Sequence, residues 1–275
     1  MVNVIRMQMH VMFSRKSTIC MYFVMYILML INFFGNVIQY YEYDIWNMYH
    51  PMKLVFLGEN SSLGFYFMQY YPFLVVMPAG FSYFTDKNSG ELIFIETRTS
   101  KKNYYLGTMI ATFATTFMIF TFPLFIEMIL NCIAFPMEAL GDQSNVQMFE
   151  PIYTEMIQGY LFSELWLFNP YIYTFAMIAL FGVVSGILAC FAAVVSMFGI
   201  SKFKILLFVP VYALLYLLRI FKKSLNLEFT TNYFFYLRIF CVEHLNETVY
   251  VLLLAILVAV IGMMLFIKMR KDELS

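Results

Sequence analysis

The stretch YIYTFAMIALFGVVSGILACFAAVVSMF occupies residues 171–198 and carries no charged side chain over its 28 positions. A helix needs about 20 mainly apolar residues to cross a hydrocarbon core about 30 Å thick. The stretch is too long for a buried strand, and its apolar residues do not alternate with a period of two. It therefore predicts a helix that crosses a membrane.

Five further stretches meet or nearly meet the same criterion, at residues 18–38, 64–84, 105–135, 205–221 and 248–267. None of them alternates as the strands of an outer-membrane barrel do. We therefore expect an all-α polytopic membrane protein, in which residues 1–275 form a single transmembrane domain of six helices.

The composition supports this class. Hydrophobic residues make up 62% of the chain and charged residues 12%, with a net charge of zero, whereas soluble domains are about 45–50% apolar and about 25% charged. These values exclude a soluble globular enzyme, a disordered chain and a basic protein that binds nucleic acid. Membrane lipids are therefore expected neighbours, and nucleic acid is not an expected partner.

The basic residues are distributed unequally if the N-terminus is placed in the cytoplasm. Of the 17 Lys and Arg residues, the outer segments then hold only Lys53, Arg219, Lys222, Lys223 and Arg238. Cytoplasmic segments of membrane proteins are enriched in Lys and Arg, so both termini are expected in the cytoplasm. The loop after 205–221 is discordant because it carries four of the five outer residues. A re-entrant 205–221 would explain this loop but would place the basic C-terminal tail outside.

Residues 1–17 mix apolar side chains with Arg6, His10, Arg15 and Lys16. This mixture is typical of an amphipathic helix that lies on the inner leaflet. The alternative is a frayed leader without a fixed position.

The loop at residues 85–104 carries the strongest functional signal. Four consecutive apolar residues, Leu92 to Ile95, lie between Glu91 and Glu96, and Arg98, Lys101 and Lys102 follow. A loop that only connects two helices does not need such a patch. An exposed apolar patch marks an interaction surface, so we expect either a docking site for a partner or a segment in contact with lipid.

The order of residues in this loop resembles that of the ABC-2-type transporter permeases. The features that carry the resemblance are an acidic residue and a glycine after the second span, a short helix, a Ser-Lys pair and a Tyr-Leu-Gly run. In this chain they are Asp86, Gly90, Glu91, residues 92–96, Ser100-Lys101 and Tyr105-Leu106-Gly107. Asn169-Pro170-Tyr171 at the start of 171–198 is a second similarity, and the likeness of topology covers most of the chain.

The resemblance implies a permease subunit whose loop after the second span is a coupling helix that fits a groove of a separate ATPase. The residues it assigns to coupling are Asp86, Gly90, Glu91, Leu92, Phe94, Ile95, Glu96, Arg98, Ser100 and Lys101. Of these, Leu92, Phe94 and Ile95 would enter the groove. The chain has no Gly-x-x-x-x-Gly-Lys-[Ser/Thr] motif, so ATP and Mg²⁺ would bind to the partner. The expected assembly has two ABC ATPase subunits and a second permease copy or a paralogue.

In the family, the second and fifth spans lie beside the central pathway. Tyr66, Gln69 and Tyr70 fall in the outer half of 64–84, and Tyr212 and Tyr216 fall in 205–221. An aromatic, weakly polar wall would suit an amphipathic substrate such as a peptide, lipid or drug, including antimicrobial peptides in export or immunity. The alternative interpretation is the aromatic belt of a membrane interface.

Glu127 is the one carboxylate inside a predicted span, and Asn131 follows one turn later. Acidic residues within membranes are costly and often functional, which makes both residues candidates for the substrate pathway. However, Glu127 lies about 30 Å along the helix from Tyr105 at 1.5 Å per residue. That position predicts the outer headgroups, where a carboxylate is readily solvated.

Small residues at Gly182, Gly186 and Ala189 permit close helix packing, within the subunit or in a dimer. The outer loop at 136–170 is acidic, with an amphipathic helix expected around 152–167. No catalytic or metal-ligand constellation is evident, so we expect neither an enzyme nor a cofactor in this chain.

We therefore expect the transmembrane subunit of an ABC exporter in a bacterial plasma membrane. A transporter without ATP linkage, or a membrane assembly scaffold, is the alternative function.

Overall fold

The computed structural model describes residues 2–45, 48–58, 61–137, 160–199, 203–225, 230–239 and 245–273, and every regular element in these ranges is helical. The elements are α1 (Val2–Ser14), α2 (Lys16–Tyr40), the 3-10 helix η2 (Pro51–Leu54), α3 (Ser62–Leu74), α4 (Ser82–Asn88), α5 (Glu91–Arg98), α6 (Lys101–Ala134), α8 (Ser163–Phe168), α9 (Pro170–Met197), the 3-10 helix η3 (Lys204–Leu207), α10 (Phe208–Leu225), α11 (Tyr233–Leu237) and α12 (Glu247–Glu273).

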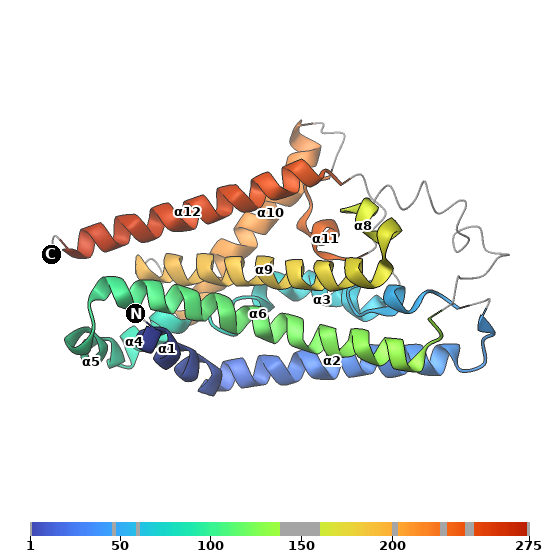
Figure 1. The fold of residues 1–275 in the computed structure, drawn as a ribbon. Helices are drawn as coiled ribbons and strands as arrows, with labels where there is room; N and C mark the ends of the chain where they lie inside the picture. The colour runs from blue at the N-terminus through green and yellow to red at the C-terminus, as the bar shows by residue number, and fades with distance from the viewer. Residues whose placement is uncertain are drawn as a thin grey trace.

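Four of these helices, α2, α6, α9 and α12, are long and apolar enough to cross a membrane. They coincide with the predicted spans at 18–38, 105–135, 171–198 and 248–267. They run along the same long axis of the molecule (Figure 1). The chain therefore has the helices of a multi-pass membrane protein, as its composition predicts.

The predicted span at 64–84 is broken into two short helices. The 13 residues of α3 cover about 20 Å at 1.5 Å per residue, less than a bilayer core. Pro72 lies inside α3 and lacks the N–H that would bond the carbonyl of Met68; the Tyr233 hydroxyl donates to that carbonyl instead, at 3.3 Å. Within the break, the Thr18 hydroxyl donates to the carbonyl of Pro78 at 2.6 Å.

The predicted span at 205–221 corresponds to η3 and the 18-residue helix α10. Arg219, Lys222 and Lys223 fall in the last two turns of α10, so its apolar part is shorter than that of the four long helices. The number of crossings beyond four therefore stays a prediction.

The two ends of the bundle differ. Both chain termini lie at one end together with α1, α4 and α5, which we call the termini end, whereas α8 and α11 lie toward the opposite end, the loop end (Figure 1). Helix α1 is the element predicted at residues 1–17, and it packs along α6 with Val4, Gln8 and Met12 buried.

At the loop end, the segment after α11 docks onto residues 55–58. The Arg238 guanidinium donates to the carbonyl of Gly58 at 2.7 Å, and the Ile239 N–H donates to the carbonyl of Leu57 at 2.9 Å. Arg238 is buried. It is one of the basic residues that made the charge distribution discordant, and its position follows from this contact rather than from exposure to either side of a membrane.

Helix α9 forms the centre of the bundle and packs most extensively on α6. Its N-terminus is capped by Asn169, whose side chain accepts the N–H groups of Tyr171 and Ile172 at 2.9 and 3.2 Å. Pro170 follows at the first helical position, where its missing N–H has no cost. The Asn-Pro-Tyr similarity noted above thus has a local structural role.

The glycines of α9 lie directly against α6. A Cβ atom on Gly182 would lie 2.1 Å from the Thr121 methyl group, and one on Gly186 would lie 2.6 Å from the Phe113 ring. Ala189 is fully buried. Among the described residues, the predicted small-residue stripe is therefore used for packing within the subunit.

Gly182→Ala should destabilise the protein by about 1–3 kcal/mol, because the added methyl group overpacks the α6–α9 contact. Gly35→Ala in α2 is the matched control, because a Cβ there meets nothing within 4 Å; it should be neutral or stabilising by up to about 1 kcal/mol through helix propensity. Thermal unfolding in detergent micelles measures both changes. Equal melting temperatures for the two variants would contradict the close packing.

Candidate functional site

Helix α5 is delimited by two residues that the sequence singles out. Gly90 precedes it with φ of +78°, a left-handed conformation that glycine adopts without steric cost. Ser100 follows it and caps α6, since its hydroxyl accepts the Asn103 N–H at 3.4 Å. A tight turn before α5 and a capped helix after it hold this eight-residue helix at the termini end (Figure 1).

The two faces of α5 differ. Leu92 and Ile95 are partly buried against a cluster that includes Tyr83, Tyr104 and Tyr105. Ile93 and Phe94 face outward and are 68% and 72% exposed. Of the three side chains predicted to enter a partner's groove, Phe94 is therefore exposed, whereas Leu92 and Ile95 are partly buried.

Charged residues lie near this exposed pair in the sequence. Glu91, Lys101 and Lys102 are exposed. The side chains of Glu96 and Arg98 lie outside the described part of the structure. Exposed apolar residues flanked by charged ones are typical of a protein interface.

Asp86 is buried and is not part of this exposed surface. Its side chain is 1% exposed and forms an ion pair with Arg15, between α1 and α2, while the Tyr104 hydroxyl donates to its other oxygen at 2.7 Å. Burial raises the pKa of Asp86, and Arg15 and Tyr104 oppose that shift. Although predicted as a coupling residue, Asp86 holds α4 against α1, α2 and α6 and does not reach the surface.

A second polar link joins α6 to the C-terminal helix. The Tyr105 hydroxyl donates to Asp272 at 2.5 Å, and the Lys268 ammonium donates to the other oxygen of Asp272 at 2.8 Å. The rings of Tyr83, Tyr104 and Tyr105 pack together with centroids 5.8 to 6.5 Å apart. Helix α4, which precedes α5, is thus linked to the N-terminal helices, and α6, which follows α5, is linked to α12.

Sequence reasoning missed Arg15, Tyr104 and Asp272 as partners in these links. Arg15 and Asp86 are 71 positions apart, and no short-range pattern connects them. The only available signal was the Tyr-Leu-Gly run at 105–107, which drew attention to this part of α6. Gly107 is a contact point as well, since a Cβ there would lie 2.9 Å from the Val4 side chain.

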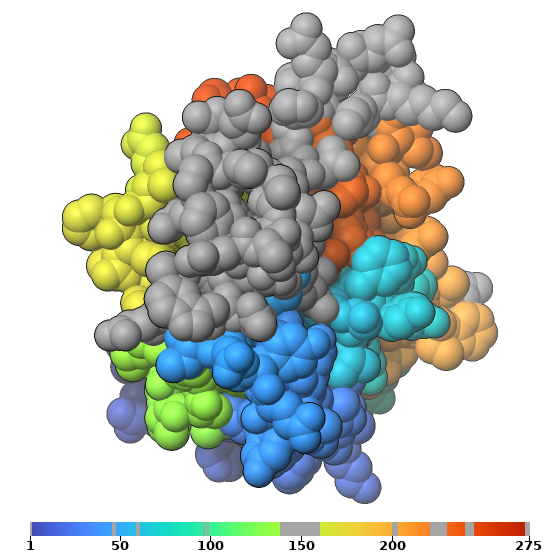
Figure 2. Space-filling view, turned by 90° about the vertical axis from the view of Figure 1, so that its right-hand side faces the viewer, coloured from blue at the N-terminus to red at the C-terminus, as the bar shows by residue number. Residues whose placement is uncertain are grey.

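The residues predicted for a substrate wall share one exposed surface, which we call the aromatic face. Helices α3 and α10 are packed together, with the Phe73 and Tyr212 rings 5.4 Å apart and the Tyr212 and Tyr216 rings stacked at 5.9 Å. Tyr66, Gln69 and Tyr70 on α3 are exposed, as are Tyr212 and Tyr216 on α10. Figure 2 shows α3 at the surface of the loop end, with the segments around α10 beside it.

Glu127 lies toward the loop end of α6, as the helical rise predicts, but protein encloses it completely. It accepts the Phe56 N–H on both oxygens, at 3.0 and 2.9 Å, and the Asn32 amide at 2.7 Å. Asn131 is also fully buried and donates to the carbonyl of Pro51 at 3.4 Å. Both candidates for the substrate pathway therefore fasten residues 51–56 to the bundle, and Glu127 is not solvated at a headgroup.

Most of the acidic outer loop lies outside the described residues, including Glu138, Asp142, Glu150 and Glu155. Helix α8 covers the end of the amphipathic helix expected at 152–167, with Glu164 in its first turn and Trp166 buried.

No family model, curated protein or solved structure matches this chain. The resemblance to ABC-2-type permeases therefore rests on the residues quoted above, and their arrangement in the fold decides what they can do.

Proposed function

We propose that the chain is the permease subunit of an ATP-driven ABC exporter. The observation that carries this proposal is α5, a short helix at the termini end that presents Ile93 and Phe94 outward. A soluble partner could enclose these two side chains, which otherwise remain exposed outside the long apolar helices. Burying them would stabilise a complex by about 1.5–3 kcal/mol per side chain.

The anchoring of α5 fits a role in transmitting motion. The Asp86 links hold α4 to the α1–α2 junction and to α6, and the Tyr105–Asp272 link joins α6 to α12. A partner that moves α5 on closing around ATP would therefore displace several helices together. The partner shifts the transmembrane equilibrium only by its preference for one of the two states.

The remaining parts of the proposal concern topology and assembly. Helices α3 and α4, with the break between them, would form the second crossing, and η3 with α10 would form the fifth, giving six crossings with both termini in the cytoplasm. The aromatic face on α3 and α10 would line the contact with a second permease copy or a paralogue. An amphipathic substrate such as a peptide, lipid or drug would pass along it, and two ATPase subunits would supply ATP and Mg²⁺.

The test is co-purification with a tagged candidate ABC ATPase from the same genome. Ile93→Asp combined with Phe94→Asp should abolish the association, because truncation of central apolar anchors commonly costs about 2 kcal/mol or more each. Thr97→Asp is the matched control, since Thr97 is exposed on the same helix and the change adds a carboxylate without removing apolar surface. Unchanged recovery of the ATPase with the double variant would refute docking through α5.

A further inference from the structure

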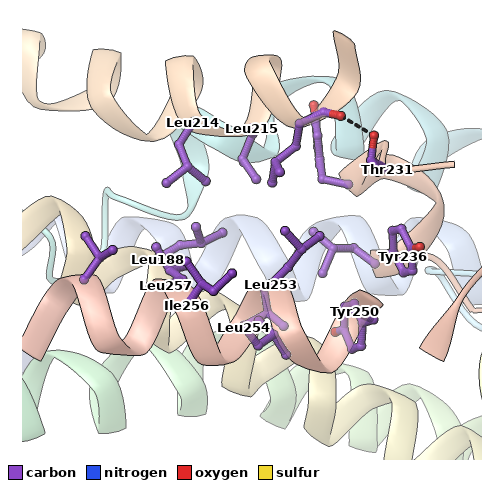
Figure 3. Close-up of a pocket in the computed structure, with 15 residues that line it drawn as sticks. Leu188, Leu214, Leu215, Thr231, Tyr236, Tyr250, Leu253, Leu254, Ile256 and Leu257 are labelled. Atoms are coloured by element: carbon purple, nitrogen blue, oxygen red, sulfur yellow. Dashed lines mark hydrogen bonds between the residues drawn. The ribbon is translucent and has the colours of Figure 1, made fainter. Parts of the chain in front are cut away.

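An apolar cavity of about 190 Å³ lies between α9, α10 and α12 and is closed at one end by residues 231–237 (Figure 3). Leu188 of α9, Leu215 of α10 and Leu257 of α12 represent its lining, which is almost wholly aliphatic along most of its length. An engineered cavity of about 150 Å³ lined by similar side chains binds benzene. The volume is therefore sufficient for an apolar ligand of at least that size.

The cavity is reached from the side of the bundle. Ile256 lines it and is 51% exposed, and α12 packs mainly on α9 and leaves much of its apolar surface uncovered. The lining residues of α12 run from Tyr250 to Val260, which is about 15 Å at 1.5 Å per residue. In a bilayer this opening would face lipid tails.

One end of the cavity is formed by Thr231 and three tyrosines. The Thr231 hydroxyl donates to the carbonyl of Leu218 at 2.6 Å, shown by the dashed line in Figure 3, and the rings of Tyr236 and Tyr250 stack with centroids 5.2 Å apart. The Tyr250 hydroxyl is buried and has no hydrogen-bond partner among the described residues. The Tyr250 hydroxyl is therefore closed off from the cavity, and the wall at this end is apolar as well.

We propose that this cavity holds one acyl chain of a phospholipid from the surrounding bilayer. The acyl chain lies along the residues of α12 that line the cavity, from Tyr250 toward Val260. The assignment requires that the protein lies in a membrane, but it does not require an ATPase partner.

The test uses the full chain reconstituted in vesicles that contain phosphatidylglycerol with a photoreactive diazirine in its acyl chain. After illumination, mass spectrometry should locate the label on α12 between Tyr250 and Val260 and on α10 near Leu215. The same label carried by zwitterionic phosphatidylcholine should mark the same residues, because the apolar lining contacts the acyl chain and not the headgroup.

Leu257→Trp fills the cavity and should strongly reduce labelling of its lining. Val258→Trp is the matched control, because Val258 is exposed on α12 and does not line the cavity. Equal labelling in the two variants, or labelling spread evenly over exposed positions such as Leu252, would overturn the acyl-chain site. These results are independent of the ATPase co-purification experiment.

Discussion

Glu127→Ala should lower the free energy of unfolding by about 3 kcal/mol or more. The substitution removes the acceptor of the Phe56 N–H and of the Asn32 amide, in a region from which water is excluded. A buried donor that loses its partner costs about 1–3 kcal/mol, and two donors lose their partner here. Because Asn32 also accepts from the Ser61 hydroxyl and donates to the Leu54 carbonyl, the loss extends into its neighbours.

Two variants separate this effect from the loss of side-chain volume. Glu127→Gln keeps one oxygen but directs an amide NH₂ toward donors, so it should lose less than Glu127→Ala and more than a surface change. Asn36→Ala removes only the half-buried bond to the Leu54 carbonyl and should cost about 1 kcal/mol. Unfolding in detergent micelles reports all three. A Glu127→Ala protein as stable as Asn36→Ala would show that the carboxyl group does not hold residues 54–56.

If Glu127 has this structural role, its oxygens are occupied and are not available to a substrate or a mobile proton. We therefore expect Glu127→Gln protein that folds to retain transport. A folded variant without transport would instead support a role of Glu127 in the substrate pathway.

The four long helices were predictable because each is an uninterrupted apolar run near or above the length of a bilayer core. The break between α3 and α4 was not. Pro72 occurs in the sequence, but proline is tolerated within membrane helices when another group satisfies the freed carbonyl. Here that group is Tyr233, 165 residues away from Met68, so the sequence pattern alone could not distinguish a continuous helix from two short ones.

The candidate site was also predictable only in part. Four apolar residues between charges indicated a patch in the loop at 85–104, and Gly90 marked the turn before it. Which of these side chains are exposed depends on how α5 is oriented against Tyr83, Tyr104 and Tyr105. That orientation is determined by tertiary packing. Of the predicted trio, Leu92 and Ile95 are therefore partly buried, and the exposed pair is Ile93 and Phe94.

Breaking the buried ion pair between Arg15 and Asp86 should have the largest effect of any single change. Asp86→Leu leaves Arg15, whose side chain is 15% exposed, without its carboxylate, and leaves the Tyr104 hydroxyl without its acceptor. Removal of one partner from a buried pair costs about 3–5 kcal/mol because the remaining charge is uncompensated. Arg15→Met should also destabilise the protein, and the double variant Arg15→Met with Asp86→Leu should recover most of the loss, because apolar replacements of a buried pair are often neutral or stabilising.

Unfolding of the four proteins in micelles completes a double-mutant cycle, with Arg6→Met, at an exposed position on α1, as the control expected within about 0.5 kcal/mol of wild type. The double variant also separates two roles of Asp86. If the pair only stabilises the fold, the recovered protein should bind an ATPase through α5 as well as wild type does. Losses of the two single variants that add to within about 0.5 kcal/mol, as they do for independent sites, would show that Arg15 and Asp86 are not coupled and that α4 is held in place by packing alone.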